Sequence, residues 1–202
     1  MYLLPGIIIG LTCHEYAHGW VANYLGDGTA RYNGRLTLNP VAHLDPIGFL
    51  MLFFAGFGWA KPVPVNPYNL QVNMKQGMLL VALAGPATNV FIALVATVLL
   101  GVFGGLGLPF LNNFLSVAIY INLVLAIFNL IPIPPLDGSR ILAGLLPGEN
   151  AWLDHLEQYG FIILIVLVFS GVLRYIFDYL ISPAANTFLN LADAISMLLR
   201  LW

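Results

Sequence analysis

Two histidines and a glutamate within five residues are the strongest chemical signal in this 202-residue chain. His14, Glu15 and His18 form the pattern H-E-x-x-H inside an apolar stretch that predicts a helix over residues 2–25. Residues four apart lie one above the other on a helix, so both imidazoles can reach one Zn²⁺ at about 2.0 to 2.1 Å. Glu15 projects about 100° further round the helix, where a general base for an activated water must lie. The motif therefore predicts a zinc site with two histidine ligands and an adjacent base.

Either histidine alone is better explained as a hydrogen-bonded residue between helices. Three ionisable side chains in one apolar helix are unfavourable in lipid unless a partner compensates them, and a bound dication does so. A catalytic zinc site needs a third protein ligand. Asp137 follows a proline-rich break, Asp27 lies in a Gly-Asp-Gly turn and Asp45 precedes a proline. The chemistry favours Asp137, which otherwise serves as a helix N-cap, and leaves Asp27 and Asp45 as alternatives.

The composition predicts a membrane protein. Apolar residues make up 60% of the chain and charged residues 8%, whereas about 25% of a soluble domain is charged. The formal net charge of −2 and the absence of clustered Lys and Arg exclude nucleic acid as a partner. A membrane-spanning helix needs about 20 apolar residues. We expect about four transmembrane helices, over residues 2–25, 78–103, 110–131 and 160–181.

Shorter elements are expected between and after these helices. Residues 47–59 are apolar but too few to cross a bilayer, which predicts a re-entrant segment. Alternating polar and apolar residues over 31–38 predict a short membrane-associated β-hairpin or edge strand. Prolines keep residues 61–67 extended. Apolar residues at helical spacing over 183–202 predict an amphipathic helix on the membrane or on a partner subunit. The predicted fold class is therefore an all-α polytopic membrane protein with a short β-hairpin or edge strand and a re-entrant segment.

The distribution of basic residues predicts the orientation in the membrane. If residues 47–59 do not cross, five of the seven basic residues lie on one side: Arg31, Arg35, Lys61, Lys75 and Arg140. The positive-inside rule makes that side cytoplasmic. The end of the first helix and Asp137 lie at the same face.

Three ordered motifs resemble the site-2 protease family of intramembrane zinc metalloproteases. H-E-Y-A-H at 14–18, G-P-A-T-N at 85–89 and N-L-I-P-I-P-P-L-D-G at 129–138 are similar to that family's HExxH, GPxxN and NxxPxPxxDG elements. G-R-L-T-L-N-P at 34–40 is similar to its membrane-associated strand region. The resemblance covers about residues 8–145 and corresponds to a short form without a PDZ or CBS domain.

The resemblance implies a catalytic site and a setting for it. One Zn²⁺ per chain is bound by His14, His18 and Asp137, with Glu15 as general base. Residues 1–147 form a metalloprotease core of three helices, and residues 148–202 add a transmembrane helix and the amphipathic helix. The implied reaction is hydrolysis of peptide bonds in or near the transmembrane segments of membrane-protein substrates. The implied location is a prokaryotic plasma membrane, crossed several times, with the active site towards the cytoplasm.

Three further polar residues are candidates for supporting roles. Asn89 and Asn129 can donate an amide N–H to a developing oxyanion or position the substrate, although asparagine in membrane helices more often joins helices. His43 is either a loop residue or a group near the mouth of the site.

Three other functions compete with intramembrane proteolysis. A metal or ion transporter predicts further ionisable residues at mid-span depth, and residues 78–103 and 110–131 contain none. An inactive scaffold has no use for Glu15. A peptidase of soluble substrates fits poorly with a site on membrane helices. The substrate's identity and the oligomeric state are not determined by the sequence.

Overall fold

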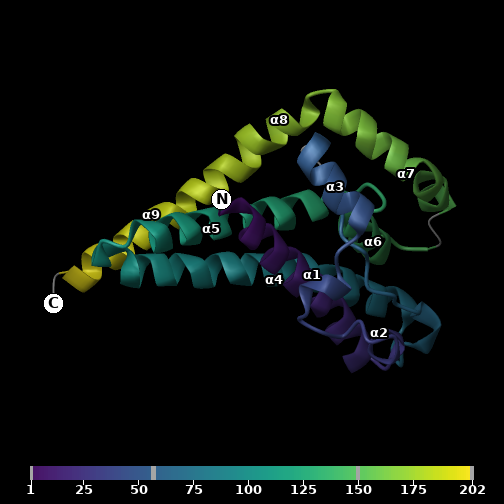
Figure 1. The fold of residues 1–202 in the computed structure, drawn as a ribbon. Helices are drawn as coiled ribbons and strands as arrows, with labels where there is room; N and C mark the ends of the chain where they lie inside the picture. Colours follow the sequence, from purple (N-terminus) through teal and green to yellow (C-terminus); the bar gives the residue numbers. More distant parts are fainter. Residues whose placement is uncertain (1, 56–57, 149–150, 201–202) are drawn as a thin grey trace.

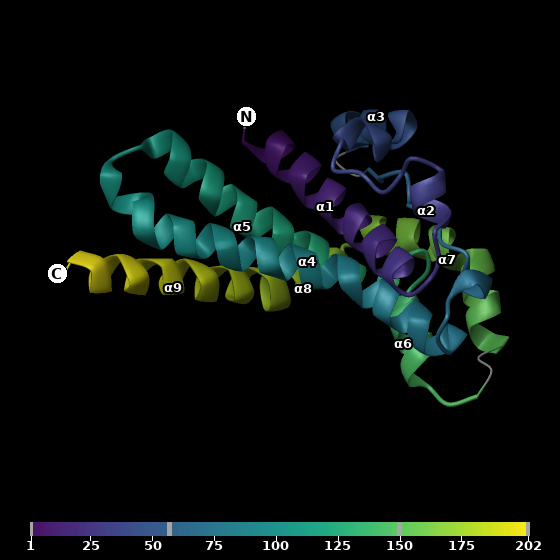
Figure 2. The ribbon, with the colours of Figure 1, turned by 90° about the horizontal axis from the view of Figure 1, so that it is seen from below.

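The computed structural model describes residues 2–55, 58–148 and 151–200, and most of them are helical (Figure 1). The helices that form the body of the structure are α1 Leu3–Tyr24, α4 Met74–Phe103, α5 Pro109–Asn129, α6 Asp137–Leu145, α7 Ala151–Phe169 and α9 Ser182–Arg200. The short elements are α2 Thr29–Tyr32, η1 Pro40–Ala42, α3 Pro46–Ala55, η2 Pro67–Asn69, η3 Gly104–Leu106, α8 Val172–Ile176 and the π-helical turn η4 Phe177–Ile181. Helices α1, α4 and α5 pack on one another; α1 crosses the other two obliquely in Figure 1 and runs beside α5 in Figure 2.

Helices α4 and α5 form an antiparallel hairpin. Small side chains of α4 let the two backbones approach closely, as is usual between membrane helices. The side chains of this core that are buried on α4, α5 and α9 are Ala93, Ala96, Leu115, Ala118, Ile119, Leu123 and Ala185. Asn73 caps α4 by accepting hydrogen bonds from the backbone N–H groups of Lys75 and Gln76. The hairpin gives α1 a rigid surface to pack against.

Fewer helices than expected are long and apolar enough to cross a membrane. By length and composition, two helices of the described residues qualify, Met74–Leu106 and Pro109–Asn129, and one bent pair would make a third. The expected count of about four is therefore not confirmed. Helix α1 has 22 residues, but His14, Glu15 and His18 lower its hydropathy.

The prediction of one uninterrupted helix over residues 160–181 is wrong. Helix α7 ends at Phe169, and the chain bends by 75° before it continues through α8, η4 and α9. Gly171 takes the left-handed conformation, with φ of 78°, and the hydroxyl of Ser170 donates to the carbonyl of Leu167. These two residues end helix α7, although the sequence remains apolar beyond this point.

The expected amphipathic C-terminal helix exists, and part of its apolar face packs against other helices of this chain. Helix α9 lies along α4 and α5 in both ribbon views. Phe188 and Leu189 pack against the core of the hairpin, and a Cβ on Gly101 would lie 2.7 Å from Ile195 Cβ. The first half of the apolar face of α9 is thus covered by this chain, whereas Leu198 and Leu199 near its end are exposed, and its location on the membrane or on a partner subunit stays a prediction.

The predicted β-hairpin or edge strand over residues 31–38 is also wrong. No strand occurs among the described residues, and their one isolated antiparallel bridge joins Leu44 to Ala60. The Asn33 side chain donates to the carbonyl of Thr29, and Gly34 takes a left-handed φ of 66°. The bond from Asn33 stabilises the helical turn of α2, and Gly34 ends it. The alternating pattern had predicted a strand at these positions.

Helix α3 and residues 61–66 have the lengths and conformations that the sequence predicts. Helix α3 has ten residues and is about 15 Å long, half the thickness of the hydrocarbon core, so it cannot cross. Residues 61–66 are neither helix nor strand, as their prolines predict. We call residues 60–66 the strap, because they lie against the C-terminal half of α1 through bonds described below.

Asp27 joins the strap to the end of α1. Its side chain is fully buried and accepts hydrogen bonds from the backbone and hydroxyl of Thr29, from the backbone N–H of Asn66 at 2.7 Å and from the Asn69 amide. Burial raises the pKa of the Asp27 carboxyl, but these donors outweigh burial and hold the pKa below its usual value. The ionised carboxylate therefore stabilises the fold.

Replacing Asp27 with Asn is expected to lower the free energy of unfolding of the detergent-solubilised protein by about 2 to 3 kcal/mol at pH 7. Because the folded-state pKa lies below the unfolded value, the carboxylate's contribution is complete above about pH 4 and is lost as the pH falls through the folded-state pKa. The difference between the melting temperatures of the two proteins should shrink as the pH falls from 7 to 3. A difference that persists undiminished at pH 3 would contradict this role.

Candidate metal centre

Three side chains from two distant parts of the chain converge at one point. His14 and His18 lie one turn apart on α1, and Asp137 is the first residue of α6. The Asp137 Oδ2 atom lies 3.1 Å from His14 Nε2 and 3.2 Å from His18 Nε2, and the two Nε2 atoms are 3.0 Å apart. Both histidines are buried, and Asp137 is largely buried. The structure thus brings together the three residues that the sequence proposed as metal ligands.

The hydrogen bonds on the far side of each ring assign its tautomer. His18 Nδ1 lies 2.6 Å from the carbonyl oxygen of Val81, which can only accept, so Nδ1 carries the proton. His14 Nδ1 lies 2.6 Å from Asn89 Oδ1, and the Asn89 amide nitrogen is committed to two other acceptors, so His14 Nδ1 also donates. In the neutral form, each ring therefore directs an Nε2 lone pair at Asp137. Second bonds of this kind are typical of metal-binding histidines.

The three atoms fit a zinc ion. Ligand atoms at about 2.0 to 2.1 Å from a tetrahedral zinc lie about 3.3 Å apart, close to the observed 3.0 to 3.2 Å. Two lone pairs and a carboxylate oxygen at these distances repel one another unless a cation lies between them. Asp137 Oδ2 is buried and makes no geometrically acceptable hydrogen bond among the described residues, which is expected of an atom that binds a metal.

Gly85 of α4 forms the floor of this centre. A Cβ on Gly85 would lie 2.5 Å from His14 Cε1 and His18 Nε2 and 2.6 Å from His14 Nε2. Any side chain at this position would enter the space that the two rings face. The centre therefore rests directly on the backbone of α4.

Asp137 is held in place by close backbone packing around α6. A Cβ on Gly138 would collide with the carbonyl oxygens of Leu130 and Ile131 at the end of α5. The Lys75 ammonium donates to the carbonyls of Leu146 and Gly148 beyond the other end of α6. The Asp137 side chain makes no N-cap hydrogen bond, so its carboxylate faces the histidines.

The alternative third ligands lie in structural positions. Asp27 is surrounded by the donors described above, and Asp45 accepts from the backbone N–H groups of Ile47 and Gly48 at the start of α3. Neither joins the group of potential metal ligands, which among the described residues consists of His14, His18 and Asp137.

Glu15 lies beside the histidines and is bound by the strap. The backbone N–H of Val63 donates to Glu15 Oε2 at 2.8 Å. The other carboxylate oxygen, Oε1, has no hydrogen-bond partner among the described residues. Glu15 is partly exposed.

Asn89 orients a histidine and has no amide proton left for an oxyanion. Its Nδ2 atom donates to the Gly10 carbonyl at 3.1 Å and to Asn122 Oδ1 at 2.9 Å, while its oxygen accepts from His14. Asn122 in turn donates to the carbonyl of Ala118 within α5. Asn122 was not among the candidates predicted from the sequence. Its only sequence signal is an amide in the middle of an apolar helix.

Asn129 and His43 make local contacts. Asn129 donates one amide N–H to the Leu125 carbonyl of its own helix, which leaves the second without a partner among the described residues. His43 is 2% exposed, and its Nε2 lies 2.8 Å from the Thr37 carbonyl, so the ring closes the loop before α3. His43 has no contact with the metal ligands in the described part of the chain.

Comparisons with known proteins agree with this centre. A model of peptidase family M50 matches residues 107–171. The protein named "Putative zinc metalloprotease YwhC" from Bacillus subtilis is 41% identical over 202 residues, which cover 96% of this chain and 92% of that protein. The chain belongs to peptidase family M50. "Putative zinc metalloprotease Rip2" from Mycobacterium tuberculosis strain H37Rv is 31% identical over 215 residues, covering 99% of this M50 chain and 80% of the relative.

A third M50 relative comes from an archaeon. "Putative zinc metalloprotease MJ0611" from Methanocaldococcus jannaschii is 33% identical over 137 residues, covering 66% of this chain and 64% of the relative. No solved structure matches significantly. The family and the names of these relatives support a zinc metalloprotease with Zn²⁺ as its cofactor. Its apolar helices indicate an integral membrane protein.

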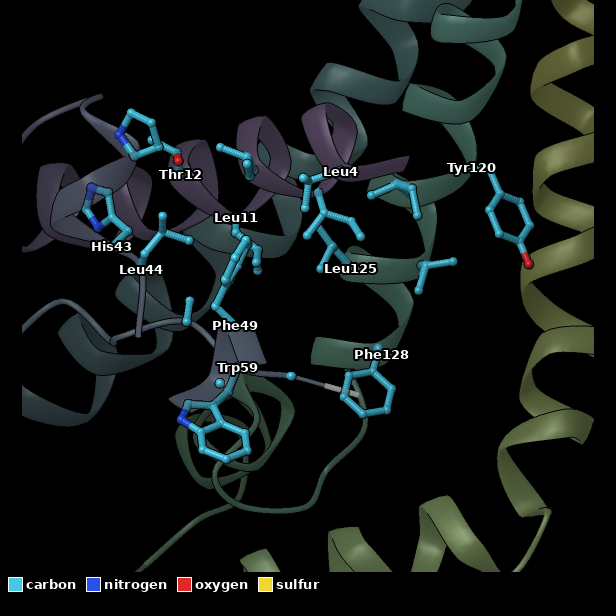
Figure 3. A pocket seen from close by; sticks show the side chains of 18 of the residues that line it. Leu4, Leu11, Thr12, His43, Leu44, Phe49, Trp59, Tyr120, Leu125 and Phe128 are labelled. Carbon is cyan, nitrogen blue, oxygen red and sulfur yellow. The ribbon is translucent and has the colours of Figure 1, made fainter. Parts of the chain in front are cut away.

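An apolar cavity of about 410 Å³ lies between α1, α5 and the segment around α3 (Figure 3). Leu4, Ile8 and Leu11 of α1 form part of its wall. By helical spacing these three residues share a face of α1 with Glu15. Leu125 and Phe128 of α5 form the opposite wall, and His43 and Leu44 close one end. The lining of the cavity on α1 ends at Thr12, about one helical turn before Glu15.

Replacing Asn89 with Ala is expected to weaken zinc binding about 10- to 100-fold, because His14 loses the bond that fixes its tautomer and ring orientation. Competition with a zinc chelator in detergent measures this affinity. Asn112→Ala is the matched control, since Asn112 donates to the Gly104 carbonyl at the far end of the hairpin. Equal affinity in wild type and Asn89→Ala would show that the amide does not support the metal centre.

Proposed function

We propose that this M50 protein is an intramembrane endopeptidase that hydrolyses peptide bonds in or near the transmembrane segments of membrane proteins. The observation that carries the proposal is the convergence of His14, His18 and Asp137 beside Glu15, on a helix packed against two strongly apolar helices. The three convergent residues would hold the zinc ion, and Glu15 would be the catalytic base.

Each protein group has a defined task in this reaction. When bound, zinc supplies Lewis-acid activation of a water and of a peptide carbonyl. Glu15 removes a proton from the attacking water through Oε1 and delivers it to the leaving amine nitrogen. Asn89 keeps His14 in the tautomer that presents Nε2. Asn129, with one uncommitted amide N–H, is the remaining candidate to stabilise the oxyanion or position the substrate.

The cavity beside α1 supplies a path for an apolar substrate segment. Apart from Thr12, its lining residues from α1 and α5 are aliphatic or aromatic, and Leu4, Ile8 and Leu11 share a face of α1 with Glu15. A helical substrate has all its backbone groups paired and must unwind before a carbonyl can be attacked. Substrates with helix-destabilising residues in the membrane are therefore expected to be cleaved fastest.

The orientation and the division of labour within the chain are part of the proposal. Arg31, Arg35, Lys61 and Lys75 belong to the segments around the end of α1 and the start of α4, and this distribution favours a cytoplasmic location for the site. Residues 1–147 would carry the chemistry. Residues 148–202 would support it, since α9 packs along α4 and α5.

Reconstitution tests the proposal directly. The zinc-loaded protein is placed in liposomes with single-span reporter proteins, one with an uninterrupted leucine-rich span and one with Asn-Gly in the middle of it. Mass spectrometry of the fragments should locate cleavage within or next to the Asn-Gly span, and Glu15→Gln should form these fragments at least about 100-fold more slowly.

Three other results would overturn the proposal. Cleavage confined to soluble peptides would identify a peptidase of soluble substrates. Zinc flux into liposomes that depends on His14 and Glu15, without cleavage, would identify a transporter. Neither cleavage nor flux from zinc-loaded protein, across a broad panel of spans, would identify a scaffold.

A further inference from the structure

The strap meets the proposed base through a backbone group. Val63 N–H donates to Glu15 Oε2 at 2.8 Å. Prolines precede and follow Val63, and proline has no N–H, so Val63 supplies the single backbone donor of the 62–64 tripeptide. The Val63 side chain is buried, and a Cβ on Gly19, one helical turn beyond Glu15, would lie 3.1 Å from Val63 Cγ1. Side chain and backbone of Val63 thus contact the same face of α1.

Bonds on both sides of Val63 fix the strap in this position. Lys61 N–H donates to the His43 carbonyl at 2.8 Å, and Asn66 N–H donates to Asp27. The Arg35 guanidinium donates to the carbonyls of Lys61 at 2.8 Å and Pro62 at 3.2 Å. The Val63 donor is therefore held against α1 by contacts that do not involve the metal ligands.

We propose that the backbone N–H of Val63 is a positioning group for Glu15. The strap holds Oε2, which fixes the carboxylate and leaves Oε1 as the oxygen that exchanges the proton. This role rests on the proposed function, because it assigns the geometry of the catalytic base. It also explains the alternating Pro-Val-Pro-Val sequence of the strap: the prolines fix an extended path, and the first valine supplies the donor.

Replacing single amides with esters tests the role. Incorporation of α-hydroxyvaline at position 63 replaces N–H with oxygen and keeps the side chain. The matched control is the same replacement at Val65, a valine of the same strap whose N–H makes no hydrogen bond among the described residues. We expect kcat to fall about tenfold or more at position 63, with KM and zinc per chain unchanged. The ester at position 65 should leave kcat within about twofold of wild type.

The split between kcat and KM separates positioning from a general structural effect. A misfolded strap would lower zinc content or melting temperature, whereas the proposal predicts loss in kcat alone. Equal kcat for the two esters would overturn it. So would a loss at position 63 that is accompanied by equal loss of bound zinc.

A measurement without activity distinguishes failure of this inference from failure of the proposed function. In protein labelled with ¹⁵N-valine, the Val63 amide signal should show slow hydrogen exchange that Glu15→Ala removes, while the Val65 signal is unchanged. If wild type cleaves no membrane protein, the proposed function fails, and the Val63 signal alone then decides whether the strap holds Glu15. A Val63 amide that does not respond to Glu15→Ala overturns the inference.

Discussion

Gly85→Ala is expected to abolish zinc binding without changing any ligand. The added methyl group would lie 2.5 to 2.6 Å from ring atoms of both histidines, in the space that the metal must share. The floor is the backbone of a long helix packed against α1 and α5, so it cannot retreat. Elemental analysis of purified protein should give about one zinc per chain for wild type and about none for Gly85→Ala.

The control for this prediction is Gly77→Ala in the same helix. A Cβ on Gly77 meets the flexible end of Leu70, 2.7 Å away, and no metal ligand. This variant should retain zinc. Full zinc content in Gly85→Ala would mean that the centre is not built against α4 and that the positions of the two rings are wrong.

Glu15→Gln is expected to lower kcat about 10²- to 10⁴-fold while zinc per chain stays at the wild-type value. Glutamine cannot take a proton from water, but its amide oxygen can still accept the hydrogen bond from Val63. The strap and the metal centre should therefore be preserved, and KM for the liposome reporter should change little. Initial rates of reporter cleavage, with zinc content measured on the same samples, provide the test.

Glu157→Gln controls for the loss of a negative charge. Glu157 is exposed on α7, so its replacement should leave kcat unchanged. If Glu15→Gln retains more than about a tenth of the wild-type kcat, another group is the base.

The sequence predicts the metal ligands on α1 because their relation is local. A spacing of four residues in a helix brings His14 and His18 together whatever the rest of the chain does. Asp137 requires the fold, since only the packing of α6 against α4 brings its carboxylate to the histidines. The motif after α5 indicated the residue, and the structure supplies the distances.

Other features of the site depend on packing that no local pattern contains. The bonds from His14 through Asn89 to Asn122 cross three helices, and asparagine in an apolar helix has many uses. Val63 acts through its backbone N–H, which every residue except proline possesses. Residue type alone therefore identifies neither the Asn89–Asn122 bond nor the Val63 N–H as part of the site.

Local bonds explain the errors in the predicted elements. The alternation over residues 31–38 suits a strand, but the Asn33 side chain and the left-handed Gly34 close a helical turn instead. The apolar run near the C-terminus continues through position 171, where one left-handed glycine bends the helix. A hydropathy average over about 20 residues changes little with one residue, so it does not detect such interruptions.

The central claim is that Asp137 completes a zinc site with His14 and His18. The most direct test is zinc per chain in wild type, Asp137→Ala and Asp45→Ala, purified identically. We predict about one zinc in wild type and Asp45→Ala and about none in Asp137→Ala. Full zinc retention in Asp137→Ala, or the absence of zinc from carefully prepared wild type, would contradict the metal centre and the proposed peptidase mechanism that depends on it.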